Sequence, residues 1–200
     1  MGSQELMLTG SHLRRKLLQL REDSTYQDVN IVARNKIIPA HKCVLAVGSA
    51  FFNVLLNKIQ AGPKAGSSGK QDEIHLANLD VSDLACLESV VNFLYTGDIE
   101  INDENFATTV KLASYLVMND LLELCEVYLV QTLTVDNCVQ FYVSLKQAGE
   151  ELGASSHSNN NMVAQTWEMI EANFYTKILT SDAILQVYRY IVLYLYWGES

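Results

Sequence analysis

The strongest constraint on the fold comes from two short runs of alternating apolar and polar residues near the start of the chain. Residues 28–33 alternate in this way, Arg34 and Asn35 follow as a short turn, and residues 36–40 return as a second run. Proline has no amide hydrogen for a sheet ladder, so Pro39 places the second run near a sheet edge or a strand end. The pattern therefore predicts a β-hairpin.

Elsewhere the apolar spacing is mainly that of helices. Leucines recur at positions i, i+4 and i+7 within residues 11–23, which predicts a helix with one apolar stripe. The next predicted elements are helices over 41–47 and 49–56, a strand over 73–77, a helix from 81 to Gly97, and a short strand over 98–101. Only helical patterns follow, among them one over 162–173 and one from 181 onward. The order of elements predicts an α+β fold with a small sheet followed by an all-helical part.

Polar residues predict where several helices begin and where loops lie. Ser49 is placed to cap the helix over 49–56. The later helices are predicted to begin at the caps Asp103, either Asn119 or Asp120, and Thr134. Two segments rich in glycine, serine or asparagine, 61–70 and 149–161, are predicted to be loops.

Composition excludes several classes of protein. With 200 residues that are 49% hydrophobic, the chain can bury a core. The formal net charge of −9 argues against a protein that coats nucleic acid, although Arg14, Arg15 and Lys16 form one basic run, which we expect to be a solvated helix face. No stretch reaches the ~18–20 apolar residues of a membrane-spanning helix. The first residues also lack the pattern of a secretory leader or a lipid anchor.

The cysteines point to a reducing compartment. Their spacing matches neither a CxxC pair nor a zinc knuckle, and each has apolar neighbours. We expect buried, reduced thiols in a cytoplasmic or nuclear protein at Cys43, Cys86, Cys125 and Cys138.

The sequence carries none of the usual motifs of catalysis. GxxxxGK[ST], GxGxxG, GxSxG and HExxH are all absent, which leaves no sequence support for an enzyme. His41 and His75 lie in or beside predicted strands without a second metal ligand at a suitable spacing, so we expect core or capping histidines. No metal site and no cofactor is predicted.

Two segments resemble the BTB/POZ domain family. Residues 28–52 contain an aspartate that opens a strand, a hairpin, the run Ala-His-Lys, the run Val-Leu-Ala and a Ser-Ala-Phe-Phe helix start. Residues 91–101 resemble the family's Phe-Leu-Tyr-Thr-Gly segment. Segments within 133–182 resemble the start of a BACK domain, the helical companion of BTB in kelch-like proteins. The resemblance implies an N-terminal arm and dimerisation helix at 1–24, a BTB/POZ domain at 25–132 and a partial BACK domain at 133–200.

The resemblance implies that the chain pairs with a second copy of itself. In the family the N-terminal helix packs against the partner subunit, and here its apolar stripe consists of Leu13, Leu17 and Leu20. The residues alone leave open the alternative that this stripe packs on its own subunit.

Kelch-like BTB-BACK proteins are substrate adaptors of cullin-3 RING ubiquitin ligases, so the resemblance also implies cullin-3 as a partner. Phe51 and Leu55 are expected to face the core of the domain instead. The residues that the resemblance places on the cullin side are Phe52, Val54, Ile59, Tyr115, Val117 and Asn119.

Two departures from the family pattern keep other functions in view. Residues 59–61 lack the acidic residue of the hydrophobic-x-Glu signature found in many cullin-binding BTB domains, and there are no kelch repeats. The alternatives are a transcriptional regulator that binds corepressor peptides and an oligomerising fragment without ligase activity. For the first alternative, the resemblance places Asp28, His41 and Lys42 near the cleft between the two subunits of the dimer. We expect the opposite charges of Asp28 and Lys42 to satisfy one another instead.

The apolar segment over 183–197 departs from the BACK pattern. It contains Arg189 and is too short to span a bilayer. We expect a truncated or alternatively terminated BACK helix; the alternative is a stripe that binds a membrane surface or a partner.

Overall fold

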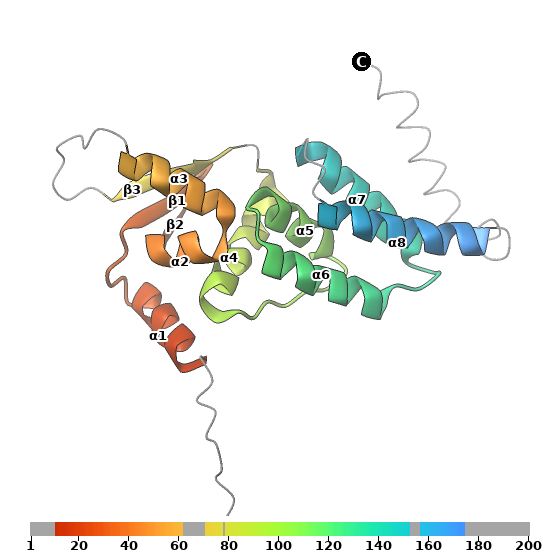
Figure 1. Ribbon diagram of the computed structural model, residues 1–200, viewed down its shortest axis with the longest axis horizontal. Helices are drawn as coiled ribbons and strands as arrows, with labels where there is room; N and C mark the ends of the chain where they lie inside the picture. The colour runs from red at the N-terminus through yellow and green to blue at the C-terminus, as the bar shows by residue number, and fades with distance from the viewer. Residues whose placement is uncertain (1–10, 62–70, 78, 153–156, 175–200) are drawn as a thin grey trace, which may run out of the picture. The chain divides into compact units, whose positions relative to one another are not determined.

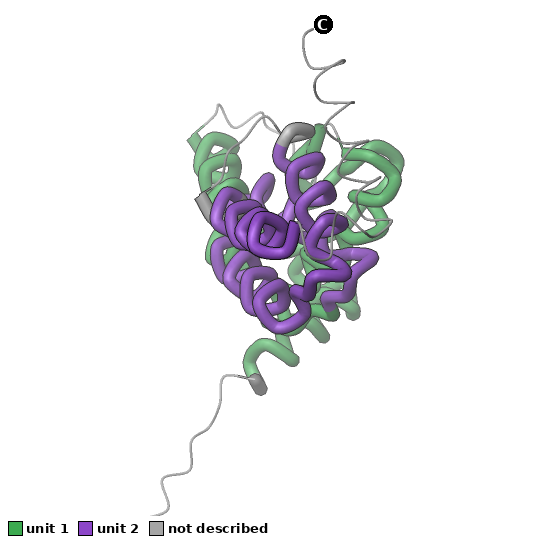
Figure 2. Tube along the Cα trace, turned by 90° about the vertical axis from the view of Figure 1, so that its right-hand side faces the viewer, with its two compact units in different colours: residues 1–100 green, residues 101–200 purple. Residues whose placement is uncertain are grey.

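The computed structural model describes residues 11–61, 71–77, 79–152 and 157–174, which fall into two compact units. The first unit covers residues 1–100 and the second covers residues 101–200; Figure 2 shows them in green and purple. The first unit holds the sheet and four helices among its described residues, and the described residues of the second form helices joined by turns, with no strand (Figure 1). This distribution agrees with the predicted α+β class.

The hairpin lies where the alternation predicts it. Strands β1 (Val29–Ala33) and β2 (Lys36–Ala40) are antiparallel, with Val29 opposite Ala40 and Ala33 opposite Lys36. Strand β3 (Asp72–Leu76) joins β1 in parallel, which gives the order β2-β1-β3. Because side chains alternate between the two faces of a strand, the odd-numbered residues of β1 all point into the core and are fully buried. Pro39 lies in an edge strand, as its missing amide requires.

The helices of the first unit also follow the sequence closely. They are α1 (Ser11–Glu22), α2 (Lys42–Gly48), α3 (Ala50–Ala61) and α4 (Val81–Thr96). The Ser49 hydroxyl accepts a hydrogen bond from the Phe52 amide at 3.2 Å, which confirms its role as a cap. Gly97 ends α4 with a φ of 76°, a left-handed conformation that glycine adopts without steric cost. Helix α1 packs along α4 of the same unit.

The second unit is built from four described helices. These are α5 (Phe106–Tyr115), α6 (Asn119–Thr132), α7 (Cys138–Leu152) and α8 (His157–Asn173). Helix α5 packs against α6 and α7, while α8 packs against α6 and α7. The predicted apolar face of α5 is correct, since Phe106, Val110 and Ala113 are fully buried.

The short strand predicted over 98–101 is wrong. These residues form no strand, and within the described part of the chain no fourth strand pairs with β2 or β3. The Thr96 hydroxyl instead accepts a hydrogen bond from the Asp98 amide at 3.1 Å and donates one to the Asp98 carbonyl at 3.0 Å. An alternating pattern does not produce a strand where a nearby side chain hydrogen-bonds the backbone amide and carbonyl that a sheet would need.

The predicted caps of α5 and α6 are also wrong. Asn102, not Asp103, accepts hydrogen bonds from the amides of Glu104 and Asn105, and α5 begins only after that turn. Helix α6 includes Asn119 as its first residue, and its capping position carries no side-chain hydrogen bond.

The cap and the loop predicted around α7 need correction as well. Asn137 accepts a hydrogen bond from the Thr134 amide at 2.7 Å, and α7 starts at Cys138. The loop predicted over 149–161 is too long, because α7 runs to Leu152 and α8 starts at His157. The Asn161 side chain, placed within that loop, belongs to α8 and donates a hydrogen bond to the Glu126 carboxylate of α6. A polar residue of the predicted loop thus belongs to a helix and contacts another helix.

The cysteines are all free thiols, as expected, but only two of them are buried. Cys125 and Cys138 are buried, Cys86 is partly buried and Cys43 is exposed. Cys43 lies in the first turn of α2 and faces solvent, although its sequence neighbours are apolar. No helix in the described part of the chain is long and apolar enough to cross a membrane. The predictions for residues 62–70 and for the segment after residue 174 lie outside the described residues.

Candidate interaction surfaces

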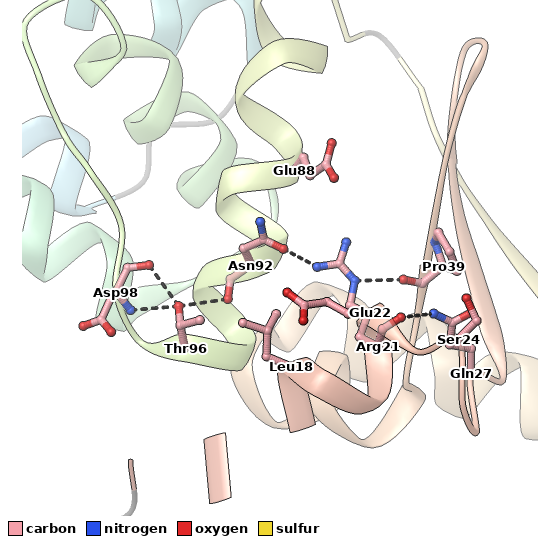
Figure 3. Close-up of a pocket in the computed structure, with 10 residues that line it drawn as sticks. All are labelled: Leu18, Arg21, Glu22, Ser24, Gln27, Pro39, Glu88, Asn92, Thr96 and Asp98. Carbon is pink, nitrogen blue, oxygen red and sulfur yellow. Dashed lines mark hydrogen bonds between the residues drawn. The ribbon is translucent and has the colours of Figure 1, made fainter. Parts of the chain in front are cut away.

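Helix α1 is fixed to its own subunit through Arg21. The Nε atom of Arg21 donates a hydrogen bond to the Pro39 carbonyl at 3.0 Å, and its Nη1 donates to the Asn92 side chain (Figure 3). The guanidinium also lies 5.2 Å from the centre of the Tyr95 ring, within range of a cation–π contact. One arginine thus joins α1 to β2 and α4.

The leucine stripe of α1 is only partly covered by this arrangement. Leu17 and Leu20 are half-buried, while Leu13 is 65% exposed. Arg14, Arg15 and Lys16 are exposed, as the predicted solvated face requires. The helix therefore packs on its own subunit and still presents apolar surface to solvent.

A cavity of about 520 Å³ lies beside this contact in the first unit (Figure 3). The Glu88 carboxylate at its edge forms an ion pair with Lys36 at 3.0 Å. The cavity is lined by Leu18, Arg21, Glu22, Ser24, Gln27, Pro39, Glu88, Asn92, Thr96 and Asp98.

The three residues predicted near a dimer cleft have structural partners within the first unit. His41 is 6% exposed, with Nδ1 3.0 Å from the Tyr95 hydroxyl and Nε2 2.9 Å from the Thr25 carbonyl. Asp28 accepts a hydrogen bond from the Lys42 amide at 2.8 Å. The Lys42 ammonium pairs with Asp72 at 2.5 Å, so the expected pairing of the Lys42 and Asp28 side chains is wrong. His41 confirms the prediction of a satisfied core histidine.

His75 departs from the same prediction. Its side chain is 67% exposed and lies 3.2 Å from the Glu73 carboxylate on the outer face of β3. It neither packs in the core nor caps a helix. Among the described residues, no group of three or more histidine, cysteine, aspartate or glutamate side chains is placed to hold a metal ion.

Tyr95 is the buried centre of this part of the first unit. It is fully buried, and its hydroxyl accepts a hydrogen bond from the His41 amide at 2.9 Å. Burial raises the pKa of the Tyr95 phenol above its ordinary value of 10.0, because a phenolate would lose the solvation that water gives it. The folded state therefore favours the neutral phenol.

We predict that Tyr95→Phe makes the protein less stable and less sensitive to alkali. At neutral pH the buried His41 amide loses its acceptor, which is expected to lower the free energy of unfolding by about 1–3 kcal/mol. Because the folded-state pKa is raised, the wild type keeps its stabilisation below pH 10 and loses it as the pH rises from 10 through that pKa. The variant lacks the Tyr95 phenol and therefore this part of the loss of stability at alkaline pH.

Urea unfolding at neutral and alkaline pH tests both effects of Tyr95→Phe. Tyr26→Phe, at a side chain that is 79% exposed, is the control and should change neither.

On α3, the three predicted cullin-side residues do not share a face. Phe52 is fully buried, so the prediction that it lies on a docking surface is wrong. At about 100° per residue, Val54 lies on the opposite side of the helix, where it is 53% exposed. Ile59 follows Phe52 by seven positions and so lies on the same side of the helix, in its last turn, where it is 37% exposed. The converse expectation, that Phe51 and Leu55 face the core, holds only in part, since both are half-buried.

The junction between α5 and α6, in the second unit, holds the other three predicted residues. Tyr115 is half-buried, Asn119 is exposed and Val117 is 45% exposed. Val117 has a φ of 51°, a conformation that a β-branched residue adopts only at a steric cost. Its amide bonds to the Ser114 carbonyl and the next amide bonds to the Ala113 carbonyl, which holds the turn in place. Sequence spacing gives no sign of this strain.

Comparison with known proteins identifies the fold family. A family model described as the BTB/POZ domain matches residues 17–133. Kelch repeat and BTB domain-containing protein 2 of Pongo abelii is 29% identical over 177 residues, which are 88% of this chain and 25% of that protein. Kelch-like protein 9 of Mus musculus is 26% identical over 124 residues, covering 61% of this chain and 19% of that protein. The chain thus spans about a quarter or less of the length of these relatives.

Solved structures agree on the fold. The BTB domain of zebrafish PATZ1 matches 66% of this chain and 100% of its own length, with a TM-score of 0.52 and 20% sequence identity. At that level of identity the likeness concerns the fold alone. The family match begins within α1, includes the sheet and extends through α6. The chain belongs to the BTB/POZ domain family, a family of protein-interaction domains with kelch-containing relatives.

Proposed function

We propose that this chain is a non-enzymatic, homodimeric adaptor that recruits cullin-3 to a RING ubiquitin ligase for the ubiquitination of a substrate. The BTB/POZ family match and the kelch-type relatives support this role. The observation that carries the proposal is apolar surface on both predicted cullin-side segments, at Val54 on α3 and at Val117 between α5 and α6. Burying such a side chain against a partner removes apolar surface from water and so contributes to binding.

The strain at Val117 adds to this support. A backbone conformation that disfavours valine persists at an exposed position, where a glycine or asparagine would fit at lower cost. Strained residues of this kind concentrate at functional sites. We infer that the Val117 side chain contacts the partner.

The alternative of a corepressor-binding regulator has less support. It relies on Asp28, His41 and Lys42 as recognition groups, and each of them already has a partner within the first unit. We place the adaptor in the cytoplasm, and also in the nucleus, where its four free thiols would stay reduced.

Titration calorimetry with the cullin-3 N-terminal region tests the docking surface. Val54→Glu and Val117→Asn, made separately, should each weaken binding about 30-fold, which corresponds to about 2 kcal/mol for a buried interface residue. Asparagine tolerates the left-handed backbone at position 117, so the second change removes the apolar contact and keeps the turn.

The matched control is Val81→Glu. Val81 is 75% exposed at the start of α4, where a carboxylate suits the helix dipole, and it is outside the predicted cullin-side residues. It should bind as the wild type does. Equal affinity of all four proteins would remove Val54 and Val117 from the interface, and a wild type that does not bind would reject the cullin-3 adaptor itself.

A further inference from the structure

One side of helix α6 faces solvent along its whole length. The helix packs against α5 and α8, and its buried residues share the opposite side: Leu121, Leu122, Cys125 and Leu129. Tyr128 lies at one border of the buried side, with its ring 5.5 Å from the ring of Phe106. Glu126 lies at the other border and accepts a hydrogen bond from Asn161 of α8. Between these borders, past the first residue of the helix, lie only exposed residues, which form the open side of α6: Asp120, Glu123, Leu124, Val127, Val130 and Gln131.

Three branched apolar side chains lie next to one another on the open side of α6. Leu124, Val127 and Val130 follow at intervals of three residues and are 41%, 53% and 63% exposed. Residues three apart are neighbours on the surface of a helix. A single exposed apolar residue needs no explanation, but the solvent side of a surface helix is normally polar, so three adjacent apolar residues there are unusual. Covering them with a partner would remove their apolar surface from water.

The charged residues of the open side are all acidic. Asp120 and Glu123 flank the apolar residues, and neither forms an ion pair with another described residue. A carboxylate in the first turn suits the helix dipole, which accounts for Asp120, but Glu123 lies beyond that turn. No lysine, arginine or histidine occurs within residues 112–145, and Lys111 of α5 is only 6% exposed. The open side therefore combines apolar surface with uncompensated negative charge.

We propose that the open side of α6 docks a basic amphipathic helix of another protein. The apolar face of such a helix covers Leu124, Val127 and Val130, as in other complexes in which a helix binds through its apolar face. Lysine or arginine at the edge of that face reaches Asp120 and Glu123, while the aliphatic part of its side chain adds to the apolar contact. A second copy of α6 does not fit this surface, because its carboxylates would meet like charges.

This surface extends beyond the residues assigned to cullin-3. At a rise of about 1.5 Å per residue, Val127 and Val130 lie about 12 and 17 Å along the helix axis past Asn119. From Asp120 to Val130 the open side is about 15 Å long, so a partner helix of about three turns is long enough to cover it. The proposal does not depend on cullin-3 binding.

A model helix of leucine and lysine serves as the probe. A peptide of about 18 residues, with leucine at i, i+3, i+4 and i+7 and lysine elsewhere, has one apolar face and is otherwise cationic. A second peptide has glutamate in place of every lysine. In titration calorimetry the full chain should bind the lysine peptide, more weakly as the salt concentration rises, and should not bind the glutamate peptide.

Val127→Gln combined with Val130→Gln tests the apolar contact. Glutamine is a good helix former, so the change removes apolar surface and keeps α6 intact, which far-UV circular dichroism checks. This variant should bind the lysine peptide at least about tenfold more weakly than the wild type. The matched control is Val47→Gln with Val81→Gln, which changes two exposed valines of the first unit and should leave the affinity unchanged.

Asp120→Asn combined with Glu123→Gln tests the charge contact. Two exposed ion pairs are lost, so the affinity for the lysine peptide should fall about fivefold and depend less on salt. The matched control is Glu22→Gln with Asp23→Asn, which changes the net charge by the same amount at two exposed residues of the first unit. It should bind the peptide as the wild type does.

Several results would overturn the inference. They include a wild type that does not bind the lysine peptide at about 1 mM, and equal binding of the glutamate peptide. Equal losses in the α6 variants and their controls would show general attraction to an acidic chain. If the Val127 and Val130 variant also lost cullin-3 binding, the open side would belong to that interface. If the same variant changed the mass of the chain alone in light scattering, the open side would contact a second copy.

Discussion

Replacing Phe52 with alanine is expected to lower the free energy of unfolding by about 3–5 kcal/mol. Phe52 is fully buried in α3, and its ring meets that of Phe51 edge to face at a centroid distance of 5.7 Å. Removing it leaves a cavity in the first unit that the sheet and helices can fill only in part. Urea unfolding followed by far-UV circular dichroism measures the loss.

Phe51→Ala is the matched control for this prediction. Phe51 is the neighbouring residue of the same type and is only half-buried, so its truncation should lower stability clearly less. Equal losses, or a larger loss at Phe51, would contradict the orientation of α3 in the first unit.

Leu13→Glu combined with Leu17→Glu is expected to convert the proposed dimer into a monomer. We propose that α1 forms the dimer interface. Leu13 is exposed and Leu17 is half-buried, so both can contact a second copy of the chain. Each large aliphatic side chain buried in such an interface contributes about 1.5–3 kcal/mol to the free energy of association, and a buried carboxylate adds a desolvation cost. Light scattering over a range of concentrations gives the mass.

Arg15→Gln combined with Gln19→Glu is the control for this variant. It changes the net charge by the same amount on the opposite face of α1, where both residues are exposed. The control should keep the mass of the wild type. A leucine variant that keeps the mass of a dimer would show that α1 does not form the dimer interface.

The elements that could be predicted from the sequence depend on local patterns. The alternation over 28–40 fixes the hairpin, because side chains on opposite faces of a strand meet core and solvent in turn. Ser49 and Gly97 also act locally, through a hydroxyl cap and a left-handed backbone. These features need no knowledge of distant residues.

The features that could not be predicted depend on contacts between distant residues. Phe51 and Phe52 are both apolar, so spacing alone cannot decide which of them faces the core; the rest of the first unit decides it. The hydrogen bond from Arg21 to Asn92 joins residues 71 positions apart. Lys42 likewise pairs with Asp72 rather than with the nearer Asp28, because β3 lies beside β1.

The candidate surface was partly predictable for the same reason. Of the residues that the resemblance assigns to the cullin side, Val54, Ile59, Val117 and Asn119 are exposed and Phe52 is buried. Contact of the exposed residues with cullin-3 stays a prediction. The strain at Val117 appears only in the backbone of the structure.

The mass of the wild-type chain mixed with the cullin-3 N-terminal region tests the central claim most directly. Each chain has a mass of 22.4 kDa, and light scattering at increasing cullin concentration should show two chains joined to two cullin fragments. Two surfaces held at a fixed separation by one dimer predict this stoichiometry. A lone chain, or a dimer beside free cullin at tens of micromolar, would contradict the account.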